Sequence, residues 1–284
     1  MSFHIEKGMA MKTLQATLVI TKPDVPERNL TSALHQLFKT YGLIAVAETM
    51  VEADLPFIKK LYDWQEVEYP RHIDRYLCTS QLHVSLMVSE TAISKALELK
   101  KEFRSQYQLT GDRLHTLIHC SDSPQVFSRE FRVINERFPF AFREPLQRGR
   151  ASQVQVIPYV ELPVGRMVLL MHRSQKKGDF WQVVTGGVNP GEDVALAGFR
   201  EMYEETKLMP TELSGPIYAY DFTESTGTLH EDVFTARLSE CYAPVLSDEH
   251  TEFQWVDSSK AHTMLKWPGN KTAMEAFIAL GKAS

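Results

Sequence analysis

The chain has 284 residues, of which 43% are hydrophobic and 24% are charged, and its formal net charge is −5. These values exclude a disordered chain, a collagen-like repeat and a disulfide scaffold, and the mild acidity disfavours a dedicated nucleic-acid binder. No apolar run reaches the roughly 20 residues that a membrane helix needs, the N-terminus lacks a secretory pattern, and the three widely spaced cysteines suit a reducing compartment. We therefore expect a cytoplasmic protein of one or two domains, with neither a membrane nor a stable nucleic-acid partner.

The first half of the sequence alternates strand and helix patterns. Short β-branched runs such as residues 16–21 predict strands, and apolar side chains at helical spacing, such as Leu30, Leu34 and Phe38, predict helices. Strands are expected at 16–21, 43–51, 82–88 and 114–118, and helices at 29–41, 55–64, 91–103 and 124–138. The order of the main elements, β-α-β-β-α-β, is that of a ferredoxin-like unit.

The pattern breaks at residues 137–151, RFPFAFREPLQRGRA, which contain two prolines and several arginines. We interpret 1–138 as one domain, 139–150 as a linker and 151–284 as a second domain. Three phenylalanines in the break, Phe138, Phe140 and Phe142, indicate that part of it packs down.

Strand patterns dominate the second half. Strands are expected at 153–159, 166–172 and 181–184 and near 216–222, 231–238 and 252–256, and helices at 192–208 and 270–280.

The strongest chemical signal is a glycine-rich stretch followed by an acidic helix. Residues 186–192 read GGVNPGE and residues 200–208 read REMYEETKL. Glycines there permit a loop with positive φ and close backbone approach to a ligand. Glu201, Glu204 and Glu205 stand at i, i+3 and i+4, so their carboxylates share one helix face and repel one another. A hard divalent cation, Mg²⁺ or Mn²⁺, would relieve that repulsion and recruit phosphate oxygens, which indicates a polyphosphate substrate.

The alternative interpretation of these glutamates is a solvated acidic helix face, with Arg200 and Glu204 paired at i, i+4. The glycines in fixed register favour the cation site instead. Their spacing resembles the Nudix box, which is glycine, five residues, glutamate, seven residues, then arginine-glutamate-apolar-any-glutamate-glutamate. The matching residues are Gly186, Glu192, Arg200, Glu201, Met202, Glu204, Glu205 and Leu208.

The chain departs from the box at Lys207, where the family pattern has glycine. A non-glycine residue costs roughly 1 kcal/mol there if φ is positive. The resemblance covers the C-terminal half and implies an α/β/α sandwich with a mixed sheet. Residues 179–186, 249–257 and 267–277 are similar to one branch in particular, the bacterial dihydroneopterin triphosphate pyrophosphohydrolases.

The resemblance also implies roles for individual residues. Arg200 would orient the glutamates, and Glu201 would act as general base. Phe180 and Trp181 would line a ring pocket, with ordinary core packing as the alternative for each. Arg173 would contact a phosphate or be a plain surface arginine. The implied metal ligands are Glu201, Glu204, Glu205, Glu249 and the carbonyl of Gly186.

Residues 14–138 resemble nucleoside diphosphate kinase. Lys22 lies in a strand-end motif of that family, His119 takes the place of its phosphorylated histidine, Glu130 that of the orienting glutamate, and Tyr62 that of an active-site tyrosine. A histidine positioned by a carboxylate suits phosphoryl transfer.

The N-terminal half also departs from the kinase pattern. Cys120 replaces a glycine, Thr116 replaces an asparagine, and the chain before His119 is too short for the family's arginine-bearing loop. The resemblance implies either a residual kinase or a vestigial site on a scaffold for dimerisation or substrate placement.

Three hypotheses for function follow. The leading one is a Mg²⁺-dependent Nudix pyrophosphohydrolase that cleaves a small-molecule triphosphate, either dihydroneopterin triphosphate or a (deoxy)nucleoside triphosphate, to a monophosphate and pyrophosphate. The others are a bifunctional protein that also transfers phosphoryl groups and a regulatory protein that binds nucleotides without turnover. A homodimer would fit the scaffold role of the N-terminal half.

Overall fold

The structure is a computed structural model that describes residues 11–63, 73–78, 80–109, 115–143, 149–224 and 227–282. Residues Leu14–Arg143 form one compact unit, and the described residues from 149 onward belong to a second. Within these ranges, no helix combines the length and the apolar character needed to cross a membrane.

The N-terminal unit is built on an antiparallel sheet whose described strands run in the order β5-β2-β3-β1-β4. This sheet and its helices confirm the ferredoxin-like architecture. The elements are β1 (Lys12–Thr21), α1 (Asp24–Glu27), α2 (Thr31–Thr40), β2 (Ile44–Val51), α3 (Leu55–Leu61), α4 (Ile73–Cys78), β3 (Leu82–Ser89), α5 (Ala92–Tyr107), β4 (Ile118–Cys120), α6 (Pro124–Asn135) and β5 (Ala141–Phe142).

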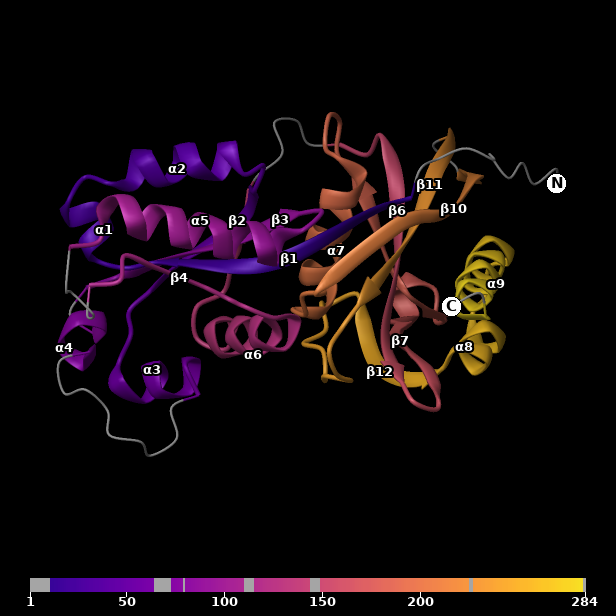
Figure 1. Ribbon diagram of the computed structural model, residues 1–284. Helices are drawn as coiled ribbons and strands as arrows, with labels where there is room; N and C mark the ends of the chain where they lie inside the picture. Colours follow the sequence, from indigo (N-terminus) through magenta and orange to yellow (C-terminus); the bar gives the residue numbers. More distant parts are fainter. Residues whose placement is uncertain are drawn as a thin grey trace. The chain divides into compact units, whose positions relative to one another are not determined.

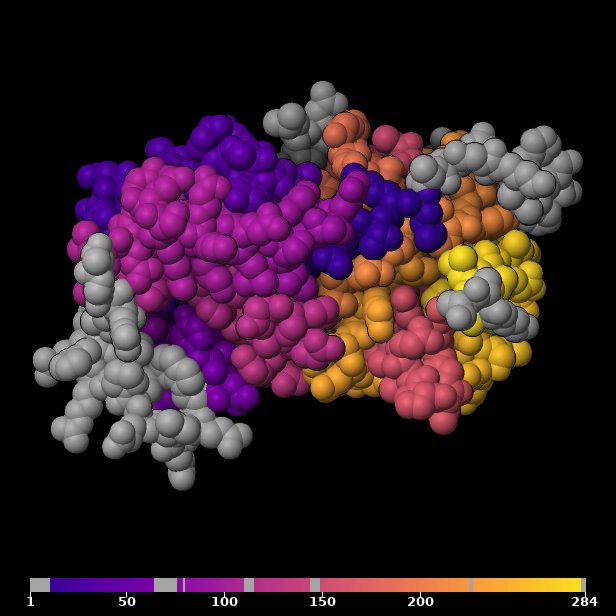
Figure 2. Space-filling model, viewed as in Figure 1, coloured from indigo at the N-terminus to yellow at the C-terminus, as the bar shows by residue number. Residues whose placement is uncertain are grey.

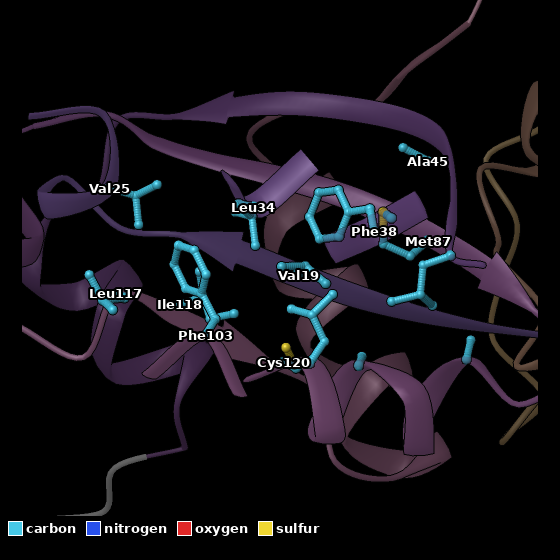
Figure 3. Close-up of a cluster of buried hydrophobic side chains, with 14 residues drawn as sticks. Val19, Val25, Leu34, Phe38, Ala45, Met87, Phe103, Leu117, Ile118 and Cys120 are labelled. Carbon is cyan, nitrogen blue, oxygen red and sulfur yellow. The ribbon is translucent and has the colours of Figure 1, made fainter. Parts of the chain in front are cut away.

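Buried apolar side chains hold α2 and α5 against one face of this sheet (Figure 1). Leu34 and Phe38 of α2 and Ala96, Leu99 and Phe103 of α5 are buried in one cluster, which Figure 3 shows around Val19 of β1. Neither helix has a side-chain hydrogen bond at its N-cap. Burying one large apolar side chain stabilises the folded state by about 1.5–3 kcal/mol. Packing of these side chains, and not N-capping, therefore holds the two helices in place.

The strand predicted at 114–118 is wrong in its bounds, because β4 covers only Ile118–Cys120 and pairs with β1. Leu117 has a φ of +59°, which is incompatible with an extended strand. Its side chain is fully buried, in the same cluster as Leu34 of α2 and Phe103 of α5. Leu117, the apolar residue before the strand, therefore packs in the core and does not extend β4. Leu114 lies outside the described residues.

The break predicted as a linker contributes to the N-terminal sheet. β5 pairs with β2, and the backbone N–H of Arg143 donates to the carbonyl of Val46 at 3.1 Å. The ring of Phe140 stacks on Phe131 of α6 at 5.0 Å. The phenylalanines in this segment thus pack down, while residues 144–148 lie outside the described ranges.

The second unit contains a mixed sheet in the order β12-β7-β6-β11-β10, with β9 paired to β6 and β8 to β7. Strands β6 and β11 are parallel and the other described pairs are antiparallel. The elements are β6 (Ser152–Leu162), β7 (Gly165–Arg173), a 3₁₀ turn (Gln175–Lys177), β8 (Trp181–Gln182), β9 (Val184–Val188), α7 (Val194–Thr206), β10 (Glu212–Glu224), β11 (Gly227–Arg237), β12 (His250–Asp257), α8 (Ser258–Met264) and α9 (Pro268–Lys282).

Helices cover both faces of this sheet, as the predicted sandwich requires. Figure 1 shows α7 on one face and α8 and α9 on the other, and Figure 2 shows α8 and α9 (yellow) at the surface of the unit. Ala273 and Phe277 of α9 pack on Ile157 of β6 and Val233 of β11. The sequence did not predict α8, a short helix capped by Asp257, whose carboxylate accepts from the Ser259 N–H at 2.8 Å.

Strand β6 has two different neighbours along one edge. It pairs with β9 over residues 152–156 and with β7 over residues 159–162. Strands β9 and β7 therefore follow one another along the same edge of β6.

Candidate active site

Gly186 and Gly187 lie within strand β9 and have no positive φ, so the expected glycine loop is wrong for these two residues. Gly191 does have a positive φ, +77°. At Gly186 the requirement is space, because a Cβ there would lie 1.8 Å from Cδ of Glu201. The bare backbone lets the Glu201 carboxylate rest directly on the strand.

We expect Gly186→Ala to lower both activity and stability. The new methyl group would force Glu201 or β9 to move, and such overpacking costs about 1–3 kcal/mol. Thermal unfolding and pyrophosphate release measure the two effects. Gly187→Ala is the matched control, because its Cβ would meet only the flexible Arg150 side chain, at 3.3 Å. Equal losses in both variants would contradict this steric role.

Helix α7 presents the box glutamates in two environments. Asp193 caps the helix by accepting from the N–H groups of Ala195 and Leu196 at 3.0 and 3.1 Å. Glu201 and Glu205 are buried, with 9% and 8% exposure, whereas the Glu204 side chain is 51% exposed. The three carboxylates thus share a helix face, but only two of them are withdrawn from solvent.

Arg200 is the cationic centre of the box. Its guanidinium donates to Glu192 at 2.8 and 2.9 Å, to Glu201 at 2.7 Å, to Glu204 at 3.1 Å and to the carbonyl of Gly187 at 2.8 Å. Although burial opposes it, hydrogen bonding from Arg200 holds the pKa of Glu192 below its usual value. Arg200 therefore ties the loop after β9 to the acidic face of α7.

Glu205 is the least compensated carboxylate of the site. Its Oε2 atom is buried and has no hydrogen-bond partner among the described residues. Burial, followed by the charges of Glu201 and Glu249, raises the pKa of Glu205 well above its usual value. A buried, unpaired carboxylate oxygen is costly unless a cation occupies the space beside it.

Glu249 approaches the site from the turn before β12. It accepts from Arg173 at 2.7 Å and from Lys177 at 2.8 Å. The Lys177 hydrogen bond is the main reason why the pKa of Glu249 is lowered. Arg173, expected at a phosphate, is thus paired with a carboxylate here. Lys177, which the sequence analysis missed, belongs to a basic pair after β7 that could have signalled it.

The residues present fit a divalent cation in chemistry but do not yet form a closed cage. In the described part of the chain, no group of three or more His, Cys, Asp or Glu side chains is gathered for a metal ion. Glu204 is paired with Arg200, and Glu249 with Arg173 and Lys177. Glu205 keeps an unpartnered oxygen for such an ion.

The two predicted ring-binding aromatics lie in different surroundings. Trp181 is half-buried, packs on the core under α9 and meets His172 edge-on at 4.9 Å. Phe180 meets Trp267 edge-on at 5.8 Å, and the ammonium of Lys266 lies 4.9 Å from both ring centroids. Trp181 thus contributes to core packing, while Phe180 belongs to an aromatic-cationic group with the exposed Trp267.

Lys207 ends α7 in the left-handed region, with a φ of +57°. Its ammonium also lies 4.6 Å from the Tyr203 ring centroid. We expect Lys207→Gly to exceed Lys207→Ala in unfolding free energy by about 1 kcal/mol, because both lose the ring contact and only glycine relieves the backbone. Denaturant unfolding of the two variants measures the difference, and equal stabilities would contradict it.

In the N-terminal unit the structure brings together the histidine, tyrosine and glutamate of the kinase-like set. His119 Nε2 lies 2.8 Å from Glu130 Oε1, and the Ser121 hydroxyl donates to Glu130 Oε2 at 2.6 Å. The Tyr62 ring meets His119 edge-on at 5.0 Å. The carboxylate therefore fixes the imidazole orientation.

Two cations of this unit, Lys22 and Arg104, donate to the protein's own oxygens. The Lys22 ammonium donates to the Thr116 hydroxyl. Arg104 donates to the carbonyls of Thr116 at 3.0 Å and Ile118 at 2.7 Å. Burial, with a smaller contribution from Arg104, lowers the pKa of Lys22 to about 8. Cys120, which replaces the family's glycine, is buried, and burial raises the pKa of its thiol to about 12.

Comparison with known proteins identifies the family of the C-terminal half and shows what the N-terminal half is similar to. The family model for the NUDIX domain matches residues 152–277. The dihydroneopterin triphosphate diphosphatase of Haemophilus influenzae is 30% identical over 124 residues, a match that covers 39% of this chain and 78% of that protein. The chain therefore belongs to the Nudix family and is a hydrolase acting on phosphoanhydride bonds.

Two further relatives extend the comparison. The solved structure of the E. coli dihydroneopterin triphosphate pyrophosphohydrolase is 25% identical, covers 47% of this chain and 99% of its own, and has a TM-score of 0.40. The nucleoside diphosphate kinase of Clostridium perfringens is 28% identical over 144 residues, covering 47% of this chain and 97% of that protein. The predicted resemblance of both halves is confirmed.

Proposed function

We propose that the second unit is a Mg²⁺-dependent pyrophosphohydrolase that cleaves dihydroneopterin triphosphate, or a (deoxy)nucleoside triphosphate, to a monophosphate and pyrophosphate. The observation that carries this proposal is the buried pair Glu201 and Glu205, with an unpartnered oxygen on Glu205. Like charges withdrawn from water call for a cation. The similarity to diphosphatases that act on dihydroneopterin triphosphate supports the substrate class.

In this proposal Glu201, Glu205 and the Gly186 carbonyl hold the cation, and Glu204 and Glu249 supply further carboxylate oxygens. A bound divalent cation supplies Lewis-acid polarisation of the phosphoanhydride and promotes ionisation of the attacking water.

The chain's own residues orient the carboxylates, accept the proton and contact the phosphates. Arg200 holds Glu201 by one oxygen at 2.7 Å and thereby orients the other toward Gly186. Glu201 accepts the proton of the attacking water. In this proposal Arg173 and Lys177, which donate to Glu249 at 2.7 and 2.8 Å, would also contact the leaving phosphates. Mn²⁺ would serve the same oxygen ligands.

A panel of triphosphates tests the proposal. The full chain is incubated with dihydroneopterin triphosphate, the deoxynucleoside triphosphates and a dinucleoside polyphosphate, with Mg²⁺, with Mn²⁺ and with EDTA. We expect pyrophosphate release from at least one triphosphate, abolished by EDTA. Absence of pyrophosphate from every substrate would contradict the reaction, and release that persists in EDTA would contradict the metal requirement.

For the N-terminal unit we infer a scaffold rather than an active kinase. Lys22 and Arg104, the cations that would meet a phosphate, already donate to Thr116 and to backbone carbonyls. We therefore expect no acid-labile, base-stable label after incubation of the full chain with labelled ATP. Incorporation of such a label, and its loss in His119→Ala, would instead establish phosphoryl transfer through the His119–Glu130 pair.

A further inference from the structure

Two buried polar side chains, Gln182 and His250, lie beside the glutamate site and have no role in the hydrolysis described above. Gln182 ends β8 and His250 begins β12, and the two residues are 5% and 6% exposed. Both strands pair with β7. Burying polar groups is unfavourable unless they are hydrogen-bonded, and two apolar side chains would fill the same space without that penalty. A buried polar pair at this place therefore indicates a role besides packing.

The hydrogen bonds of the pair fix the protonation of the imidazole. Gln182 Nε2 donates to the Thr185 hydroxyl at 3.4 Å and lies 3.3 Å from His250 Nε2. An amide nitrogen can only donate, so His250 Nε2 is the acceptor and the ring proton is on Nδ1. Nδ1 then donates to the Ser247 hydroxyl, 3.3 Å away. The imidazole thus joins β8 to the turn that precedes β12.

Both ends of this chain of hydrogen bonds reach Glu205. At one end, the backbone N–H of Ser247 donates to the backbone carbonyl of Glu205 at 3.2 Å. At the other end, the backbone N–H of Thr185 donates to the Glu205 carboxylate. A closed network therefore runs through Glu205, Ser247, His250, Gln182 and Thr185.

The network passes through the two segments that carry other proposed ligands of the cation. Thr185 precedes Gly186, whose carbonyl is one such ligand, and Glu249 lies in the turn from Ser247 to His250. The backbone N–H of His250 closes that turn on the Ser247 carbonyl at 3.2 Å. A change in the network would therefore move β9 and this turn relative to α7.

We propose that His250 and Gln182 are positioning residues for the divalent-cation site. They hold β9 and the turn before β12 around Glu205, so that the oxygen ligands are in place when the cation binds. Because both side chains are uncharged in this arrangement, they order the ligands without competing with the cation for them. This inference deepens the proposed function and rests on it for the cation.

Binding of Mn²⁺, followed by electron paramagnetic resonance of the free ion, tests the inference without turnover. The full chain is titrated with Mn²⁺, and the binding that Glu205→Gln removes is assigned to the site. We expect His250→Leu and Gln182→Leu each to weaken that binding roughly tenfold or more. His250→Gln keeps an acceptor for Gln182 and should bind Mn²⁺ at least about threefold more tightly than His250→Leu.

Two controls separate positioning from folding. His262→Leu should leave Mn²⁺ binding unchanged, because this histidine of α8 is paired with Glu275 at 3.0 Å outside the network. In the double variant Gln182→Leu/His250→Leu both partners become apolar, which is nearly neutral for folding. We expect its thermal midpoint in EDTA to stay within about 3 °C of the wild type while its Mn²⁺ affinity falls.

The possible failures are distinguishable. Wild-type Mn²⁺ affinity in both His250→Leu and Gln182→Leu would overturn the positioning role and leave the proposed reaction untouched. Equal losses of affinity in His250→Gln and His250→Leu would also overturn it, because the contact with Gln182 would then be irrelevant. A double variant whose midpoint in EDTA falls together with its affinity would show a purely structural role. A wild type without any Mn²⁺ binding that depends on Glu205 would instead refute the cation site of the proposed function, and this inference with it.

Discussion

Glu205→Gln is expected to lower Mg²⁺-dependent pyrophosphate release on the order of a thousandfold. The variant loses the negative charge of a carboxylate whose second oxygen has no partner among the described residues, while shape and burial stay the same. The charge stabilisation supplied by a bound cation is worth several kcal/mol in the transition state. Glu201→Gln should lower pyrophosphate release by a comparable factor, since it weakens the same cation site and removes the proton acceptor.

The same substitution should not harm the metal-free fold. Burial and the neighbouring charges of Glu201 and Glu249 raise the pKa of Glu205, so the charged carboxylate opposes folding when no cation is bound. We therefore expect Glu205→Gln to match or exceed the wild type in thermal midpoint in EDTA and to gain less on addition of Mg²⁺. Near-normal turnover in both Glu201→Gln and Glu205→Gln would contradict the proposed metal site.

Glu231→Gln is expected to stabilise the protein at pH 8 by about 3 kcal/mol. Burial is the largest influence on Glu231 and raises its pKa from 4.5 to about 7, against the Tyr220 hydrogen bond and the charge of Arg150. Between these two values the folded protein retains a proton that the unfolded chain has released. Stability therefore falls as the pH rises from about 4.5 to about 7, by about 1.4 kcal/mol for each unit of difference.

Urea unfolding at pH 5 and pH 8 measures this effect. Glutamine is neutral at both values, so the variant and the wild type should be similar at pH 5 and separate at pH 8. The charged or titratable neighbours Arg150, Asp232 and Tyr220 are present in both proteins and cancel in the difference. An unchanged difference between pH 5 and pH 8 would show that Glu231 is not held protonated in the fold.

Sequence patterns predicted most elements of both units to within a few residues, because helical and strand periodicities arise from the contacts of each element with one core. They missed the short elements α1, α4, α8 and β5, predicted β8 and β9 as one strand at 181–184, and misplaced β4. For α8, β5 and β4 the deciding feature was short or non-local: the Asp257 cap, the stacking of Phe140 on Phe131, and the positive φ of Leu117. A single window of sequence does not contain such partners.

For the active site, the sequence by itself determined the class of chemistry, since the spacing of Glu201 and Glu205 on one helix face follows from helix geometry alone. Only the tertiary structure decided that Gly186 is required for space, that Glu249 is held by Arg173 and Lys177, and that Tyr220 contacts both Gln155 and Glu231. Those contacts join strands and helices far apart in the chain, and their energies depend on burial, which exists only once the sheet has formed.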